Sequence, residues 1–282
     1  MTVFNNQKEL KAHLNLLSKN NKTIGFVPTM GALHNGHLSL IKKSFQQNDV
    51  TVVSIFVNPT QFNNKEDLDK YPRTLEEDIK KIKSLNSDII IYAPTIEDIY
   101  GEKVISESFN YDGLENQMEG KQRPGHFDGV GTIVKTLFKI INPNRAYFGE
   151  KDYQQVLIIK KMVEKHQLPV KIVMCPILRE KNGLAMSSRN ERLTSEEREK
   201  ASFIHVTLLK TKELFQTKSL QEVYDFVSKT FQSQKKLDLE YFTIADSKTL
   251  VEITKKYKTK KYRAFIAVNV GKVRLIDTIS LN

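Results

Sequence analysis

The stretch at residues 23–44, TIGFVPTMGALHNGHLSLIKKS, constrains the fold of this chain more than any other part of it. Its apolar run Ile24–Val27 is typical of a buried strand, which Pro28 and Gly31 are expected to end. Apolar positions from Leu38 onward then form one face of a helix. A strand, loop and helix in this order leave the N–H groups of the first helical turn unpaired, and these groups favour an anion such as phosphate.

Two histidines stand at the start of this predicted helix. His34 and His37 are three residues apart, so both rings can project from one side of the first turn. Gly36 between them lets a ligand approach the backbone closely. Taken alone, the HNGH pattern leaves three interpretations open: a phosphate-binding pair, a metal-binding pair and a helix cap.

A second strand follows, which makes the unit a βαβ crossover. Residues Asp49–Val57 are β-branched and apolar nearly throughout, as is typical of a central parallel strand covered on both faces. The strand ends at Asn58–Phe62, and ligands of open α/β sheets bind beyond the carboxyl ends of strands. Gln61 is therefore either on the same rim as the two histidines or an ordinary turn amide.

Further helices and strands are expected along the rest of the first two thirds of the chain. The polar segment 63–73 is expected to be mobile at the mouth of the rim. His126 follows a glycine-rich loop of no specific motif and is expected to pack. Helices are predicted at 7–19, 75–85, 134–141 and 154–167, and strands at 88–92, 146–148 and 170–175, with a weak strand near 103–108.

The strand predicted at 146–148 has the same arrangement as the strand before the histidines, because it is followed by Gly149 and the charged start of a helix. Lys151 at this strand end is well placed to neutralise a phosphate or a carboxylate. Asp152 either caps the helix or binds a ribose hydroxyl, and Gln155 is expected to point back into the cleft.

A later loop carries Met186, Ser187, Ser188 and Arg189 in a row. Its two hydroxyl groups and one guanidinium suit the oxygens of a polyphosphate.

The organisation changes near residue 177. Two amphipathic helices are predicted, followed by strand patterns of which the last two are joined tightly at Gly271. Helices followed by antiparallel strands indicate a separate α+β domain. The predicted fold is α/β, with a Rossmann-like parallel-sheet domain at 1–176 and a smaller α+β domain at 177–282. The helices are expected at 195–216 and 219–233, and the strands at 239–245, 262–270 and 272–277.

Composition limits the class of protein. The 282 residues are 39% hydrophobic, enough for one substantial core and a second smaller one. No apolar run has membrane-spanning length and the amino terminus lacks a signal-peptide pattern, so a soluble, cytoplasmic protein is expected. The net charge of +11 suits nucleic acid, acidic membranes and phosphorylated small molecules alike. The basic run 255–263 is expected to be a solvated loop, and Cys175 a buried strand residue rather than an activated thiol.

Five motifs, taken together and in this order, resemble the pantothenate synthetase family, the pantoate–β-alanine ligases. They are PTMGALHNGH (28–37), FVNPTQF (56–62), YPRT (71–74), FGEKDYQQ (148–155) and GLAMSSRN (183–190). HNGH is similar to the HxGH signature of nucleotidyl transferases and class I aminoacyl-tRNA synthetases, and MSSR stands where those enzymes carry a KMSKS-type loop.

The resemblance implies a two-step ligation. The carboxylate of pantoate would attack the α-phosphate of ATP, releasing diphosphate and leaving pantoyl adenylate. The amine of β-alanine would then displace AMP to give pantothenate. Because nucleotidyl transfer is catalysed mainly by positioning and charge stabilisation, no protein nucleophile is needed. The resemblance also implies Mg²⁺ with the ATP, a homodimer, and neither a nucleic-acid nor a membrane partner.

The same resemblance implies roles for individual residues. His34, His37 and Lys151 are the implied catalytic groups, with His37 as proton donor and Lys151 bridging the α-phosphate and the attacking carboxylate. Gln61 and Gln155 are the implied pantoate-binding residues, Gln61 also serving β-alanine. No protein ligand for a metal is implied. The implied ATP-binding residues are Met30, Gly31, Ala32, Leu33, His34, Asn35, Gly36, His37, Gly149, Glu150, Lys151, Asp152, Leu178, Met186, Ser187, Ser188 and Arg189.

Three other classes stay open from the sequence. An adenylyl transferase acting on a nucleotide or on phosphopantetheine would share the HxGH logic but would stop after joining AMP to a phosphate. A nucleic-acid-binding module would use the positive charge, although no RNA motif is readable. A purely structural protein is the third class, against which five motifs in register argue together.

Overall fold

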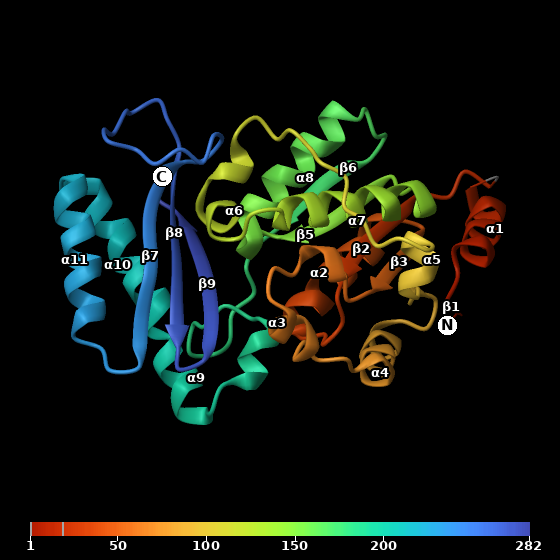
Figure 1. Ribbon diagram of the computed structural model, residues 1–282, viewed down its shortest axis with the longest axis horizontal. Coiled ribbons are helices and arrows are strands. Elements are labelled where there is room, and N and C mark those ends of the chain that lie inside the picture. The colour runs from red at the N-terminus through yellow and green to blue at the C-terminus, as the bar shows by residue number, and fades with distance from the viewer. Residues whose placement is uncertain (1, 19) are drawn as a thin grey trace. The chain divides into compact units, whose positions relative to one another are not determined.

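The computed structural model describes residues 2–18 and 20–282 (Figure 1). The chain divides into two compact units, Met1–Pro176 and Ile177–Asn282. Within the described residues, no helix combines the length and apolar character needed to cross a membrane.

The first unit is built on a parallel six-stranded sheet with the order β1-β4-β3-β2-β5-β6. The chain order of the strands reverses between β2 and β5, and this switch point is where open α/β sheets bind ligands. The predicted Rossmann-like sheet is confirmed. The strands are β1 (Val3–Phe4), β2 (Ile24–Thr29), β3 (Val50–Ile55), β4 (Ile90–Tyr92), β5 (Arg145–Gly149) and β6 (Lys171–Cys175).

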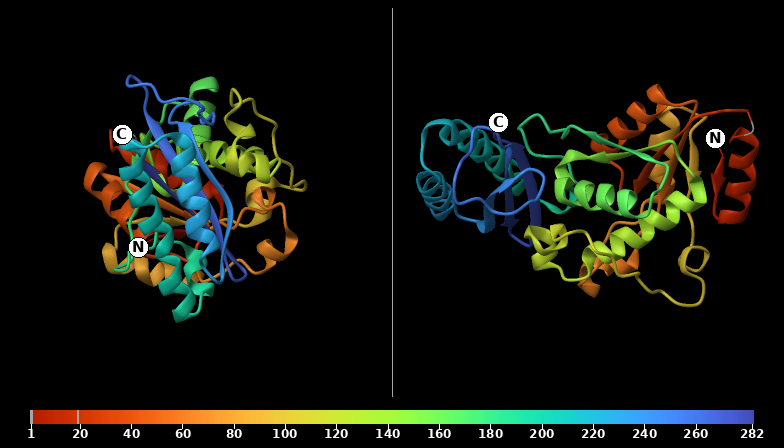
Figure 2. Two further views of the ribbon diagram at one scale, coloured as in Figure 1. Left: turned by 90° about the vertical axis from the view of Figure 1, so that its left-hand side faces the viewer. Right: turned by 90° about the horizontal axis from the view of Figure 1, so that it is seen from above.

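Helices cover both faces of this sheet (Figure 2, right). Successive side chains of a strand point to opposite faces, and the neighbours Phe26 and Val27 show this in β2. Phe26 packs edge-on against Phe138 of α7, with ring centroids 6.1 Å apart. Val27 belongs to the core cluster that Ile41 of α2 and Ile82 of α4 complete on the other face. The helices are α1 (Gln7–Ser18), α2 (Asn35–Gln47), α3 (Lys65–Asp69), α4 (Leu75–Leu85), α5 (Ile96–Tyr100), α6 (Met118–Gln122), α7 (His126–Ile141) and α8 (Tyr153–Lys165).

Pro28 does not end its strand, contrary to the prediction. It lies inside β2 and is aligned with Ser54 of β3. On the other side, β5 pairs only with Gly25 and Phe26 of β2, so Pro28 lies where the ladder to β5 has already ended. A strand tolerates proline where no ladder hydrogen bond is required of it.

Two segments of the first unit differ from the sequence expectation. Residues 103–108 contain no strand, so the weak strand prediction is wrong; Val104 and Ile105 are exposed, and a short apolar alternation without a partner strand does not form a ladder. The polar segment 63–73 contains the short helix α3, and its Tyr71 is buried against Phe62, with ring centroids 5.7 Å apart. Its mobility stays a prediction.

The second unit is α+β, as predicted. Its three-stranded antiparallel sheet has the order β7-β8-β9, and the two-residue loop at Gly271, where φ is +56°, joins β8 to β9. The single helix predicted at 195–216 is interrupted at Ser202, whose hydroxyl donates to the Glu199 carbonyl, a local bond that competes with helix continuation. The elements are α9 (Ser195–Ala201), α10 (Phe203–Thr217), α11 (Leu220–Gln232), β7 (Leu237–Asp246), β8 (Tyr262–Val270) and β9 (Val273–Ser280).

Candidate active site

The loop at residues 30–34 connects β2 to α2 and has an unusual backbone. Gly31 has φ of +84° and Ala32 has φ of +49°, so two consecutive residues are in the left-handed region. A Cβ at Gly31 would lie 3.1 Å from Asp78 Oδ2 and 3.2 Å from Ile55 Cγ2. Any other residue at position 31 would be strained by this conformation and would crowd Asp78 and Ile55.

The two histidines cap helix α2. His34 is the N-cap residue, and its Nδ1 accepts a hydrogen bond of 3.1 Å from the Gly36 N–H. His37 Nδ1 accepts from the His34 N–H at 3.4 Å, and the two ring centroids are 4.0 Å apart. The helix-cap interpretation is thus confirmed, and each ring accepts in the cap through its Nδ1. Because Nδ1 accepts in both rings, Nε2 carries the proton of each neutral imidazole.

The pKa of His37 lies well below its ordinary value. Burial of the ring is the largest cause, followed by the positive charges of His34, Lys151 and Lys81. His37 is consequently neutral near pH 7, which favours hydrogen-bond donation through Nε2 over its expected role as a proton donor. The metal-pair interpretation has no further ligands, since no group of three His, Cys, Asp or Glu side chains suited to a metal occurs in the described part of the chain.

Lys151 lies in the 3₁₀ turn η3 (Glu150–Asp152), directly after β5. Its side chain is only 17% exposed, and Nζ donates to Asp152 Oδ1 at 3.1 Å. Asp152 stands at the N-cap position of α8 but makes no capping hydrogen bond, so that expected role is wrong. Because β5 pairs with β2, and because Lys151 acts electrostatically on His37, the lysine and the histidine loop share one edge of the sheet.

Gln61 lies against the same loop. It ends the 3₁₀ turn η1 (Pro59–Gln61) beyond β3, and its Nε2 donates to Met30 Sδ at 3.0 Å. Its Oε1 accepts from Asn58 Nδ2 at 3.1 Å. Asn58 is fully buried and also donates to the Gly129 carbonyl at 3.2 Å, so it ties η1 to α7.

Gln155 and Gln154 differ although they are adjacent in α8. Gln154 is buried and donates to the Leu114 and Gln117 carbonyls, each at 2.8 Å, so its role is structural. Gln155 is half-buried and makes no side-chain hydrogen bond among the described residues. Its amide is therefore available to a ligand.

Sequence reasoning missed two residues that hold Gln61 in place. His126 Nδ1 donates to the Gln61 carbonyl at 2.7 Å, and Arg123 Nη2 donates to the same oxygen at 3.1 Å. Burial, and then the Arg123 charge, lowers the pKa of His126 to about 4. The signal in the sequence that pointed to this contact was the glycine at position 129. A Cβ there would lie 2.3 Å from the Thr60 carbonyl oxygen, so glycine allows the close approach of α7 to η1.

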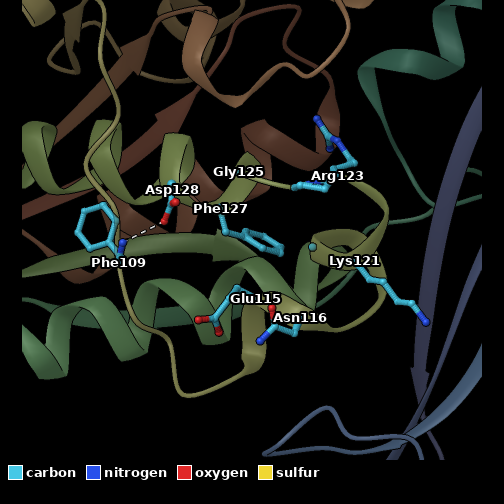
Figure 3. A pocket seen from close by; sticks show the side chains of 10 residues that line it. Phe109, Glu115, Asn116, Lys121, Arg123, Gly125, Phe127 and Asp128 are labelled. Atoms are coloured by element: carbon cyan, nitrogen blue, oxygen red, sulfur yellow. Dashed lines mark hydrogen bonds between the residues drawn. The ribbon is translucent and has the colours of Figure 1, made fainter.

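A cavity of about 320 Å³ lies at the N-terminal end of α7. Glu115, Lys121, Arg123 and Phe127 are among its lining residues, and Figure 3 shows Glu115 and Lys121 extending in different directions. None of the sequence-predicted site residues lines it.

In the second unit, the candidate phosphate-binding residues belong to a short turned segment. The Met186 N–H donates to the Leu178 carbonyl at 3.0 Å, and Arg179 and Ala185 form a β-bridge. Ser187 accepts from the Arg189 N–H at 3.3 Å and caps the 3₁₀ helix η4 (Ser188–Arg192).

Acidic side chains hold this segment. Glu180 accepts from Arg198 Nε at 2.8 Å and from Asn190 Nδ2 at 2.8 Å. Arg179 forms a two-pronged ion pair with buried Asp277, at 2.6 and 3.0 Å. The segment that carries Ser187, Ser188 and Arg189 is thus fixed on both of its flanks.

Taken by itself, the first unit offers a site for an anion. The neutral imidazole of His37, the neighbouring ring of His34, the partly buried ammonium of Lys151 and the N-terminus of α2 all lie at the switch point of the sheet. Such a set stabilises phosphate and the charge that develops during its transfer.

Sequence comparisons show which proteins the chain is similar to. A family model described as pantoate-beta-alanine ligase matches residues 2–280. The chain is 64% identical over 281 residues to the pantothenate synthetase of Flavobacterium psychrophilum, with 100% of each chain covered. It is 51% identical over 282 residues to that of Christiangramia forsetii, again with 100% of each chain covered.

Solved structures agree with these matches. The pantothenate synthetase of Thermus thermophilus superposes with a TM-score of 0.91 at 37% identity, covering 100% of this chain and 99% of that one. A pantoate-beta-alanine ligase of Francisella tularensis, complexed with beta-gamma ATP and beta-alanine, gives 0.81 at 40% identity, with 100% and 98% covered. The chain therefore belongs to the pantoate–β-alanine ligase family.

Proposed function

We propose that this enzyme joins pantoate to β-alanine in two steps driven by ATP. In the first step a carboxylate oxygen of pantoate attacks the α-phosphorus, the bond to the β-phosphate oxygen breaks, and diphosphate leaves. In the second step the amine of β-alanine attacks the carbonyl carbon of pantoyl adenylate. AMP leaves with the electron pair of the broken C–O bond, and the amine loses a proton as the amide forms.

The observation that carries this proposal is the meeting of His34, His37 and Lys151 at the switch point of the sheet, beside a helix N-terminus. These groups bind and neutralise phosphate, and none of them has to act as a nucleophile. The Francisella relative was solved in complex with beta-gamma ATP and beta-alanine, which supports ATP and β-alanine as substrates of this chain.

In this proposal, His34 and His37 donate hydrogen bonds from Nε2 to the phosphate oxygens as charge develops on them. Lys151 bridges the α-phosphate and the attacking carboxylate. Residues 30–37 and Gly149–Asp152 line the nucleotide, with the main chain of Met30 and Gly149 next to adenosine. The donors are fixed before the reaction, so they need little reorganisation during it.

The remaining roles follow the same chemistry. Gln61 and Gln155 bind the hydroxyl and carboxylate groups of pantoate, and Gln61 also binds β-alanine. The 177–282 unit contributes Ser187, Ser188 and Arg189 to the β- and γ-phosphates, and Leu178 and Met186 to the nucleotide. Mg²⁺ belongs to the proposal as the ion carried by the ATP phosphates, with no protein ligand assigned. The proposal also includes a cytoplasmic location and a homodimer.

Product analysis tests the proposal. The enzyme is incubated with ATP, pantoate and β-alanine, and the nucleotide product is identified by chromatography. We expect AMP and diphosphate in equal amounts with pantothenate. Formation of ADP and phosphate would contradict the adenylate and indicate an acyl phosphate.

A further inference from the structure

Asp78 is a fully buried carboxylate that none of the roles above uses. It lies in the first turn of α4 and is 0% exposed, whereas its neighbours Glu76 and Glu77 are exposed. Aspartate is rarely buried unless it is paired or hydrogen-bonded. An acidic side chain at this buried position therefore requires hydrogen-bond partners.

The carboxylate accepts hydrogen bonds from the backbone of the histidine loop. Asp78 Oδ2 accepts from the Ala32 N–H at 2.9 Å, and Oδ1 accepts from the Leu33 N–H at 2.7 Å. The Thr74 hydroxyl also donates to Oδ2, at 3.2 Å. Successive backbone N–H groups of this kind form an anion-binding concavity, which the protein here fills with its own side chain.

A second residue of α4 also binds the backbone of the histidine loop. Lys81 Nζ donates to the Leu33 carbonyl at 2.7 Å, so α4 holds both the N–H and the C=O of one loop residue. The Leu33 side chain is buried in the core. His34 follows directly, and its own N–H donates to His37 Nδ1. A shift of Leu33 would therefore move the capping bond that fixes the protonated nitrogen of His37.

The left-handed backbone of Gly31 and Ala32 explains why the loop needs these hydrogen bonds from α4. Ala32 with φ of +49° is strained relative to the ordinary regions of the backbone, and such conformations persist only where the surroundings fix them. We propose that Asp78 is a positioning residue for ATP activation: it locks the Gly31–Ala32 turn so that the Nε2–H groups of His34 and His37 face the phosphates. This inference rests on the proposed function for its catalytic consequence only.

The test compares Asp78→Asn with Glu77→Gln, an exposed neighbour on the same helix that serves as the matched control. An asparagine keeps the volume but offers only one acceptor oxygen, so one loop N–H loses its partner. Two quantities are measured: amide hydrogen exchange of residues 30–37 by mass spectrometry, and the pantoate-dependent exchange of labelled diphosphate into ATP. For Asp78→Asn we expect faster amide exchange in this segment and a fall in kcat of about tenfold or more, because small displacements of reacting groups are costly.

A merely structural role would lower kcat only in proportion to the unfolded fraction. We therefore expect Tm to stay high enough that the variant is fully folded at the assay temperature. If Asp78→Asn does not fold, Lys81→Met replaces it, since Lys81 is half-buried and its variant removes the bond to the Leu33 carbonyl. This variant also removes a positive charge that acts on His37, so amide exchange of the loop is its deciding readout. We expect the same changes at about threefold. The inference would be overturned if residues 30–37 exchanged their amides in the variants as slowly as in the wild-type enzyme. It would also be overturned if the variants exchanged faster but kept the wild-type kcat. If the wild-type enzyme itself shows no pantoate-dependent exchange, the proposed function fails, while the amide exchange still decides whether Asp78 holds the loop.

Discussion

The loops that carry the two clusters of candidate site residues are fixed in different ways. In the first unit, the carboxylate of Asp78 accepts directly from the loop backbone and has no ion-pair partner among the described residues. In the second unit, Glu180 and Asp277 pair with arginines, and these pairs hold the flanks of the segment that ends in Ser187–Arg189. The first loop therefore depends on hydrogen-bond geometry and the second on charge pairing. The first should tolerate salt better, because ion pairs that water reaches are screened.

The largest expected effect concerns His37 and Lys151, which lie at the same edge of the first unit's sheet. His37→Ala and Lys151→Ala should each lower pantoate-dependent diphosphate exchange by about a hundredfold or more, because each removes a donor to the developing charge. His13→Ala is the matched control: His13 lies in α1, its ring packs near Phe4, and its loss should leave the exchange unchanged. Near-normal exchange in either of the first two variants would contradict the role given to that residue.

The second prediction concerns the pH dependence of stability that His126 gives to the first unit. His126 has a folded pKa of about 4 against about 6.5 when unfolded, so below pH 6.5 the unfolded chain binds a proton that the folded chain does not. The fold should lose about 3 kcal/mol from this residue as the pH falls from 6.5 to about 4. Urea unfolding followed across this range measures the loss.

The control for the titration is His126→Asn, which retains a donor for the Gln61 carbonyl but cannot titrate. Its free energy of unfolding should depend less steeply on pH between 6.5 and 4. An unchanged slope would mean that His126 is not held neutral. The pKa values of His37 and of His205 in the second unit are also lowered by burial, so a residual slope is expected.

The smallest effect is expected at the second loop. Glu180→Gln should raise the KM for ATP several-fold and destabilise the chain by about 1 kcal/mol, because Arg198 is partly exposed and solvent screens its pair. Glu191→Gln is the control, since Glu191 is exposed and touches Arg198 only at 3.4 Å. Raising the salt concentration should increase the KM of the wild-type enzyme toward that of Glu180→Gln. A salt-independent KM would show that charge pairing does not fix this loop.

Local patterns predicted much of the first unit. The strand before the histidines, the helix Leu75–Leu85 and the buried positions at 134–141 follow from apolar periodicity that tertiary packing then reinforces. The first half of α7, from His126, was predicted as a glycine-rich loop and is helical instead. Gln61 and Lys151 were predicted at strand ends, and the parallel sheet puts those ends on one edge. The position of a strand end is enough to locate such residues.

Contacts between distant segments could not be predicted in this way. Asp78 lies on a helix whose charged first turn is expected of any helix N-terminus, and nothing local distinguishes it from exposed Glu76 and Glu77. Its partners in the histidine loop lie 45 and 46 residues away. His126 was likewise expected only to pack, because its acceptor is a backbone carbonyl 65 residues away. Residues that position others through the backbone leave no motif of their own.

The central claim is that the histidine loop and Lys151 activate a carboxylate with AMP before any amine is present. Exchange of labelled diphosphate into ATP, measured with pantoate and without β-alanine, tests it most directly. We expect exchange that requires pantoate and falls in His37→Ala and Lys151→Ala. No exchange until β-alanine is added, in an enzyme that still forms pantothenate, would contradict the account.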